Sequence, residues 1–251
     1  MTQKILAVVN QKGGVGKTTT AINVAAQLAE KSSVLLVDLD PQGNATSGLG
    51  LTSQETKLTT YDVLLGRATL AKVVQETHVA QLFVLPSNAN LAGAEVELVS
   101  QPQREFALKN TLQSASYDFV IIDCPPSLGL LTINALTAAT DVLIPVQAEY
   151  YALEGLSQLL NTIQAVRGST NPSLELLGIV LTMYDKRNSL SEQVQTEVAN
   201  YFGEKLFKTV VPRNVRLAEA PSYGRTIYEH DRWSKGARAY KSLAKEVRER
   251  T

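Results

Sequence analysis

Three glycines between two lysines, at residues 12 to 17, constrain this chain more than any other feature. The stretch reads Lys-Gly-Gly-Val-Gly-Lys and continues into three threonines. An apolar run from Ile5 to Val9 leads into it, and Ala21 to Ala29 follows with apolar residues at helical spacing. The pattern predicts a strand, a glycine-rich turn and a helix. Because such a turn points backbone N–H groups inward at a helix N-terminus, it predicts a phosphate-binding site.

This order of residues is a variant of the P-loop, since Gln11 stands where the usual pattern has glycine. We expect Lys17 to reach the β- and γ-phosphates and Thr18 to offer its hydroxyl to Mg²⁺. A flexible surface turn with two solvated lysines is the alternative interpretation. The loop residues expected to hold a nucleotide are Gly13, Gly14, Val15, Gly16, Lys17, Thr18 and Thr19.

Two carboxylates, Asp38 and Asp40, follow the next apolar run, Val34 to Val37. Carboxylates at the C-terminal edge of a buried strand lie on the ligand side of an α/β sheet, and alternation along the strand makes these two point the same way. One could support the Mg²⁺ shell, and the other could orient the attacking water. Ordinary turn chemistry before Pro41 and Gly43 is the alternative.

A third carboxylate, Asp123, closes the apolar run Phe119 to Ile122. A strand of large apolar residues that ends in aspartate resembles a Walker B segment, whose carboxylate holds Mg²⁺ through a water. The next residue, Cys124, is expected to be a small buried filler, because no histidine lies near it in the sequence to activate a thiol.

Strands and helices are expected to alternate from residue 5 to residue 202, which is typical of right-handed βαβ units. We therefore predict an α/β fold with a mostly parallel, twisted sheet flanked by helices on both faces. With 251 residues and 44% apolar content, the chain is expected to form one domain over residues 1–251. Further strands are expected at Leu82–Leu85, Val142–Val146 and Leu174–Met183, and helices at Tyr61–Leu65, Ala92–Val99, Glu105–Leu112, Leu153–Val166, Leu190–Phe202 and Ala237–Arg250.

The carboxyl-terminal part is basic although the whole chain is neutral. Residues 205–251 hold 12 Lys or Arg against 5 Asp or Glu. This excess indicates a polyanionic partner, with a solvated helix face as the alternative. One cysteine, no signal peptide and no apolar run of ~18 residues predict a cytoplasmic protein. The last helix has too narrow an apolar stripe for a membrane anchor.

Five segments of the chain resemble the ParA/Soj chromosome-partitioning ATPases, which belong to the deviant Walker A class that also contains MinD. They begin at Lys12, Asp38, Asp123, Pro145 and Pro212. The resemblance covers residues 4–250 and keeps the spacing of the motifs. It implies the fold of a P-loop NTPase, with ATP and Mg²⁺ as cofactors.

The resemblance also implies roles for single residues. Lys12 matches the lysine that reaches across a nucleotide-sandwich homodimer to the phosphates of the partner's ATP, much as an arginine finger does. Asp40 matches the aspartate needed for hydrolysis. Glu149 matches a glutamate near the nucleotide across the dimer interface, and Met183 and Pro212 match the region that lines the adenine. The expected metal residues are then Thr18, Asp38 and Asp123.

Family members bind double-stranded DNA without sequence preference once they dimerise. Arg187 and Arg216 match their DNA-contacting arginines, and surface ion pairs are the alternative role for both. Other basic residues that could contribute are Lys205, Lys208, Lys235, Arg238 and Lys241, with surface ion pairs as the alternative role. The resemblance further implies a nucleoid-associated protein whose ATP hydrolysis is stimulated by a centromere-binding partner of the ParB/Spo0J kind.

Two other classes of function are open to this fold. A MinD-like regulator that cycles on membranes is the first, and the charged ending of the last helix argues against it. The second is a metabolic enzyme, such as a dethiobiotin-synthetase-like ligase or an iron-protein-like reductase. The reductase needs paired cluster cysteines, which Cys124 alone cannot supply, and no sequence feature indicates the carboxylate pocket that the ligase needs.

Overall fold

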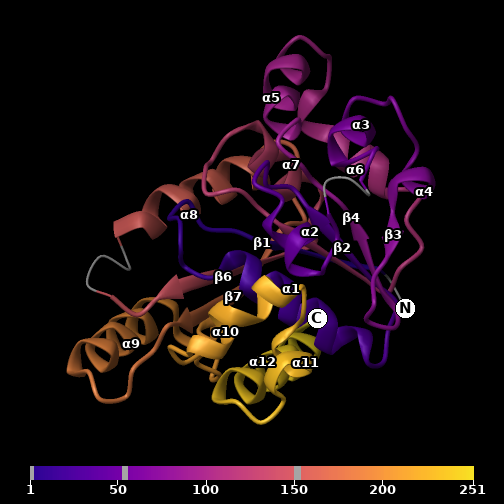
Figure 1. Ribbon diagram of the computed structural model, residues 1–251. Coiled ribbons are helices and arrows are strands. Elements are labelled where there is room, and N and C mark those ends of the chain that lie inside the picture. The colour runs from indigo at the N-terminus through magenta and orange to yellow at the C-terminus, as the bar shows by residue number, and fades with distance from the viewer. Residues whose placement is uncertain (1–2, 53–55, 150–153) are drawn as a thin grey trace.

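A seven-stranded sheet forms the centre of the protein (Figure 1). The computed structural model describes residues 3–52, 56–149 and 154–251. Within them the strand order is β3-β4-β2-β5-β1-β6-β7, and neighbouring strands run parallel except for β3, which is antiparallel to β4. The predicted mostly parallel sheet is thus confirmed. The strands are β1 (Lys4–Val8), β2 (Val34–Asp38), β3 (Gln75–Glu76), β4 (Leu82–Leu85), β5 (Phe119–Asp123), β6 (Asp141–Gln147) and β7 (Glu175–Thr182).

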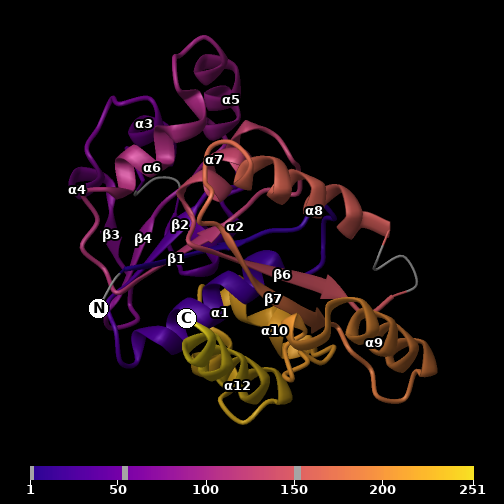
Figure 2. The ribbon, with the colours of Figure 1, turned by 180° about the vertical axis from the view of Figure 1, so that it is seen from behind.

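Helices cover both faces of the sheet, as Figures 1 and 2 show from opposite sides. α1, α11 and α12 pack on one face, and α3 to α8 pack on the other. The helices are α1 (Lys17–Ala29), α2 (Asn44–Gly48), α3 (Thr60–Leu64), α4 (Leu70–Val73), α5 (Leu91–Val99), α6 (Ala107–Leu112), α7 (Leu130–Ala138), α8 (Glu154–Arg167), α9 (Ser189–Phe202), α10 (Val215–Glu219), α11 (Ile227–Asp231) and α12 (Lys235–Arg250). Leu153, the expected start of α8, lies outside the described residues.

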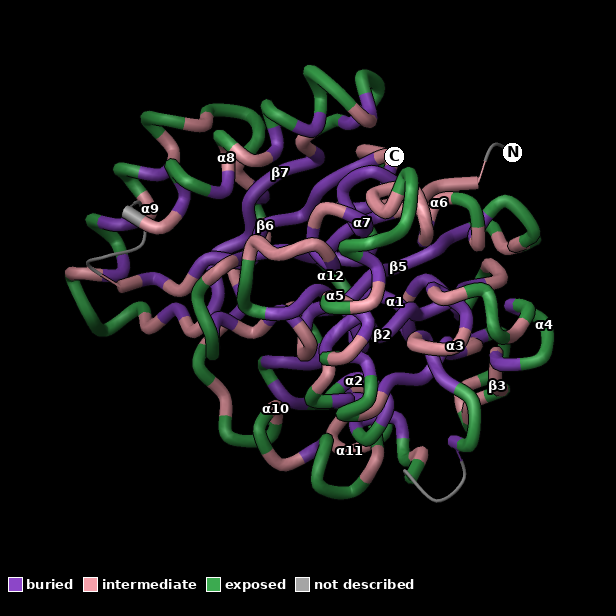
Figure 3. The backbone as a smooth tube through the Cα atoms, turned by 90° about the horizontal axis from the view of Figure 1, so that it is seen from above, coloured by how far each residue is buried: buried purple, intermediate pink, exposed green. Residues whose placement is uncertain are grey.

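Alternation along the strands builds the two cores. Leu36 and Ile121 pack into the cluster with α1 and α12, whereas their neighbours Val37 and Ile122 pack into the cluster on the opposite face. β2 and β5 are buried along their whole length, and the central tube of Figure 3 is correspondingly purple. This double burial explains why both strands are continuous apolar runs in the sequence.

One helix of the sheet's second face, α7, was not among the sequence predictions. It is apolar nearly all round, and seven of its nine residues are buried. Without a polar face it has no helical periodicity to read. The short helices α2, α4, α10 and α11 were not predicted either, because pieces of four or five residues carry too little pattern.

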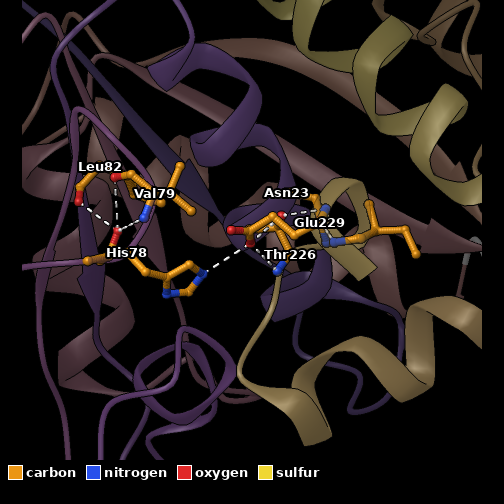
Figure 4. Close-up of polar contacts among 8 residues, drawn as sticks. Asn23, His78, Val79, Leu82, Thr226 and Glu229 are labelled. Carbon is orange, nitrogen blue, oxygen red and sulfur yellow. Dashed lines mark hydrogen bonds and ion pairs between the residues drawn. The ribbon is translucent and has the colours of Figure 1, made fainter. Parts of the chain in front are cut away.

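The carboxyl-terminal segment is fastened to α1 and to the far edge of the sheet. The hydroxyls of Thr20 and Tyr240 lie 3.1 Å apart in a buried contact between α1 and α12. Asn23 Oδ1 accepts the backbone N–H of Ile227 at 2.8 Å. Figure 4 shows His78, which follows β3, pointing toward Glu229 of α11, with 3.0 Å between His78 Nε2 and Glu229 Oε2. These contacts fix the position of α12 relative to the glycine loop.

Candidate nucleotide site and basic groove

The glycine loop joins β1 to α1 in the predicted strand–turn–helix order. Gly14 and Gly16 adopt φ angles of 76° and 87°, in the left-handed region that favours glycine. A Cβ atom placed on Gly13 or Gly14 would meet nothing within 4 Å, so open space lies in front of this backbone. Val15 turns inward and is buried, while its carbonyl accepts the hydroxyl of Thr182 at 2.8 Å.

A cavity of about 440 Å³ opens in front of the loop. Its lining brings together residues that are distant in the sequence, including Asp40 from the β2–α2 loop and Met183 from the end of β7. A concave site of this size, bordered by a glycine loop and a helix N-terminus, suits a phosphate chain. The loop residues that line it are Gly13, Gly14, Gly16, Lys17, Thr18 and Thr19.

Lys17 lies in this cavity with only 7% of its surface exposed. Its Nζ donates to the backbone carbonyl of Lys12 at 3.0 Å. Burial lowers the pKa of Lys17, and the carboxylates of Asp123 and Asp40 partly offset that effect. The ammonium group is therefore held close to the loop, where phosphate oxygens would find it.

Asp123 is the most unusual side chain of the site. It is fully buried, and neither carboxylate oxygen has a hydrogen-bond partner among the described residues. Burial raises the pKa of Asp123 well above its usual range, and the charge of nearby Asp38 raises it further. An unpartnered buried carboxylate beside Thr18 fits a cation held directly or through water. Cys124 is fully buried as predicted, and burial raises the pKa of its thiol.

Asp38 is also fully buried, but its oxygens are occupied. Oδ2 accepts the backbone N–H of Thr46 at 2.8 Å and the Thr46 hydroxyl at 2.7 Å, and Oδ1 accepts the N–H of Asp40 at 3.2 Å. Burial raises the pKa of Asp38 to about 6, which these hydrogen bonds moderate. Asp38 thus anchors α2, the structural role that its sequence context also allowed, and its place in a metal shell stays a prediction.

Asp40 borders the cavity on the β2–α2 loop. Its Oδ1 accepts the backbone N–H of Gln42 at 2.9 Å, and its carbonyl accepts the hydroxyl of Ser87 at 2.8 Å. Among the described residues no hydrogen bond to Oδ2 is found, so Asp40 can shape the turn and still accept a hydrogen bond from a water in the cavity. The turn-shaping role is thus present in the structure, and the role of Asp40 toward the attacking water stays a prediction.

Lys12 turns toward Glu149 at the mouth of the loop. Lys12 Nζ lies 3.7 Å from Glu149 Oε2, and Arg213 lies 3.6 Å from Glu149 Oε1. Both side chains of the Lys12–Glu149 pair are nearly half exposed. Glu149 thus connects two cations at the surface beside the cavity, and neither Lys12 nor Glu149 belongs to the cavity lining.

Met183 and Pro212 meet in a second, mainly apolar cavity of about 310 Å³ that shares Gly16 and Thr19 with the first. Asn214 lines it as well and offers a polar edge. An apolar slot that adjoins a phosphate site is the setting expected for an adenine ring. The roles of Met183 and Pro212 at the base stay a prediction that this placement supports.

The expected DNA-binding residues separate into two groups. Arg187 and Lys235 line one groove of about 670 Å³, which we call the basic groove. Its charged lining is Lys186, Arg187, Arg213, Lys235 and Arg238, with Asp185 as the acidic member. Lys205, Lys208 and Arg216 do not belong to this lining. Sequence reasoning had left Lys186 and Arg213 without a role.

Both predicted DNA-contacting arginines make surface ion pairs. Arg187 donates to the two oxygens of Asp185 at 3.1 and 2.9 Å, and these bonds lower the pKa of Asp185 to about 2. Arg216 donates to Glu219 at 2.7 Å and lies 3.8 Å from Asp231. Exposed ion pairs of this kind are weak because water screens them, so both arginines could exchange their carboxylate partners for phosphates.

Two functional residues escaped the sequence reasoning. Thr46 joins Asp38 to Ser87, whose N–H donates to the Thr46 hydroxyl at 2.9 Å. Thr182, at the end of β7, fastens the glycine loop through Val15. For Thr182, the available signal was a single polar residue at the end of an apolar strand run. For Thr46, there was no signal beyond its position in the segment that begins at Asp38.

Comparisons with known proteins agree with this geometry. The family model described as "AAA domain" matches residues 3–176. The sporulation initiation inhibitor protein Soj of Bacillus subtilis is 56% identical over 97% of this chain and 98% of its own. The chromosome partitioning protein ParA of Caulobacter vibrioides is 50% identical over 97% and 93%.

A solved structure is similar as well. Cobyrinic acid a,c-diamide synthase from Mycobacterium smegmatis, with bound ATP analog and magnesium, has a TM-score of 0.85 and 42% identity over 97% of this chain and 93% of its own. No helix of the described residues is both long and apolar enough to cross a membrane. With identities of 50% and 56% across almost the whole chain and the glycine-loop site in place, the protein belongs to the Soj/ParA family of chromosome-partitioning P-loop ATPases.

Proposed function

We propose that this chain is a Mg²⁺-dependent ATP hydrolase that forms a homodimer around ATP and, in that state, binds double-stranded DNA without sequence preference. The observation that carries the proposal is the cavity in which the glycine loop, Lys17 and Asp40 meet beside the unpartnered carboxylate of Asp123. The loop N–H groups and Lys17 bind the phosphates. Thr18 and Asp123 hold Mg²⁺, which supplies charge neutralisation for phosphoryl transfer, and Asp40 orients the attacking water.

Lys12 acts across the dimer in this proposal. Its ion pair with Glu149 is half exposed, and such pairs contribute only ~0–1 kcal/mol. The phosphates of a nucleotide on a second copy are therefore a stronger partner than Glu149. Glu149, once released, remains at the same surface and can meet a group of the second copy.

Dimerisation also explains how nucleotide state controls DNA binding. Each copy carries one set of basic residues, so two copies double the number of phosphate contacts and steepen the salt dependence. A ParB/Spo0J-type protein then accelerates hydrolysis and releases the dimer from the nucleoid, within the cytoplasm. The name of the 50% identical relative, a chromosome partitioning protein, supports a role of this kind.

An amide-forming enzyme is the second candidate, because the name of the 42% identical solved structure denotes a synthase. The higher identity to partitioning proteins and the basic groove favour the DNA-binding function. A MinD-like regulator would require an anchor that binds a membrane, and the surface of α12 carries charged side chains instead.

The decisive experiment measures the molecular mass of the Asp40→Ala protein in solution with and without ATP and Mg²⁺. We expect an ATP-dependent dimer that the Asp40→Ala, Lys12→Ala protein does not form. DNA binding by the same two proteins is then followed at increasing salt. A monomer with ATP, or DNA binding that ignores nucleotide, contradicts the proposal.

A further inference from the structure

We propose that the DNA-binding surface continues from the basic groove along α12 into a second groove between α1 and α12, which holds a further stretch of phosphodiester backbone. This inference rests on the proposed DNA-binding function. It extends that function to Lys31, Lys245 and Arg248, to which the sequence assigned no role. The second groove, called here the α1–α12 groove, has a volume of about 500 Å³.

The α1–α12 groove is lined by cations on both walls. Lys31 lies just beyond the end of α1, and four basic residues come from α12. Glu30 is the acidic residue of the lining. The α12 residues are Arg238, Lys241, Lys245 and Arg248.

These four α12 residues form one stripe. Their spacing of three, four and three residues places them on one side of a helix, next to the buried face that holds Tyr240 and Leu243. With a rise of 1.5 Å per residue, the stripe from Arg238 to Arg248 is ~15 Å long. One strand of duplex DNA carries a phosphate every ~3.4 Å along the axis, so the stripe spans about four phosphates.

Most of these basic side chains form no ion pair within the described part of the chain. Among the described residues, the ion pair along this groove joins Lys245 to Glu249 at 3.7 Å. Lys31, Arg238 and Lys241 have no carboxylate partner there, and all three are exposed. A lining with five basic residues and one acidic residue attracts a polyanion.

Arg248 holds the floor of the groove in place. It donates to the Ser32 hydroxyl and to the Leu28 carbonyl, each at 3.0 Å, and its guanidinium lies 5.5 Å from the centre of the Phe119 ring. The positive wall is therefore fastened to the end of α1 rather than carried on a free side chain. Because its side chain is already held, Arg248 loses less side-chain entropy when it binds a phosphate.

Arg238 makes the two grooves continuous, because it lines both. A duplex that meets Arg187 and Lys235 in the basic groove can follow Arg238 along α12 into the second groove. The apolar lining residues of the second groove, Leu28 and Ala244, are buried. Since a membrane site needs exposed apolar side chains to insert, the groove fits DNA better than a lipid surface.

The test uses the double variant Lys31→Gln, Lys241→Gln, which removes one charge from each wall and keeps a polar side chain at each position. Its matched control, Lys57→Gln, Lys72→Gln, removes two exposed charges outside both grooves. The affinity of each full-length protein for a random-sequence duplex is measured with ATP and Mg²⁺ from 50 to 300 mM salt. Dimer formation and basal ATP hydrolysis are measured in parallel.

We expect the slope of log affinity against log salt to fall by about 3.6 for the groove variant, because each of the two copies loses two contacts of about 0.9 each. The control should keep the wild-type slope, and all proteins should dimerise with ATP. If the groove variant keeps the wild-type slope while the wild type binds DNA, the extended surface is wrong and the proposed function stands.

If the wild type dimerises with ATP but does not bind DNA, both ideas fail. Vesicles of anionic phospholipid provide the remaining arm of the test. Vesicle binding that depends on Lys31 and Lys241, together with an unchanged DNA slope, overturns the assignment to DNA.

Discussion

Asp38 and Asp123 are direct partners across the parallel β2–β5 ladder, and both side chains are fully buried. Parallel strands in register present such partners on the same face, which here is the face covered by α1. Besides burial, the charge of Asp38 consequently raises the pKa of Asp123. Asp38 is satisfied by Thr46, whereas Asp123 has no hydrogen-bond partner among the described residues. Asp38 therefore has a structural role, whereas the carboxylate of Asp123 is available to a ligand.

Asp123→Asn should increase the free energy of unfolding at pH 8 while it removes Mg²⁺-dependent ATP binding. Because the pKa of Asp123 is raised in the folded protein, the folded chain keeps a proton that the unfolded chain releases, and wild-type stability falls as pH rises above about 4. Each pKa unit by which the folded and unfolded states differ changes the free energy of unfolding by about 1.4 kcal/mol. The advantage of the variant should therefore shrink toward pH 4 in urea unfolding.

Asp118→Asn is the control for this pH dependence. Hydrogen bonds from Ser33 lower the pKa of Asp118, so its contribution to stability is present at neutral pH and is lost as pH falls below about 4. The two variants should change stability in opposite directions at pH 8. An Asp123→Asn advantage that grows as pH falls would contradict the assignment of a buried, unpartnered charge.

Thr46→Val should reduce the free energy of unfolding by about 1–3 kcal/mol. The change leaves the buried Asp38 carboxylate and the Ser87 N–H without their shared partner. Chemical denaturation measures the effect, and Thr196→Val serves as the control because that exposed hydroxyl donates to the Glu192 carbonyl one turn earlier. Equal losses in the two variants would show that the Asp38–Thr46 contact is not special.

Gly224→Ala should cost more stability than Gly66→Ala, although both glycines have left-handed φ angles near 60–69°. A Cβ on Gly224 would lie 2.6 Å from the backbone Cα of Gly50, whereas one on Gly66 would meet nothing within 4 Å. We expect about 1 kcal/mol for Gly66→Ala from backbone strain alone, and at least ~2 kcal/mol for Gly224→Ala. Thermal and urea unfolding measure both variants. If they lose similar amounts of stability, the close approach of Gly224 to Gly50 is ruled out.

Tyr240→Phe and Thr20→Val should be coupled by about 1 kcal/mol in a double-mutant cycle. Their hydroxyls form a buried hydrogen bond between α12 and the helix that follows the glycine loop. Urea unfolding of the two single variants and the double variant gives the coupling energy. If the stability losses of the two single variants add up to that of the double variant, the two hydroxyls do not hydrogen-bond to each other in solution.

Local sequence patterns were enough for much of the site. The lysines and glycines of the loop, the aspartates after β2 and β5, and the burial of Cys124 all follow from short runs whose chemistry is local. Strand direction and strand ends then placed Asp38 and Asp123 at one edge of the sheet. The roles of these residues toward ATP and Mg²⁺ remain predictions for the experiments above.

Other properties arise only when distant segments meet. Sequence alone determined the phosphate-binding loop and the mostly parallel sheet, because both depend on periodicity and on backbone freedom at glycine. It did not reveal α7, whose burial on all sides removes the polar face that marks a helix. Only the tertiary structure decided that Asp38 is satisfied and Asp123 is not, and that Arg238 joins two basic grooves, because hydrogen-bond partners and neighbouring charges come from elements far apart in the chain.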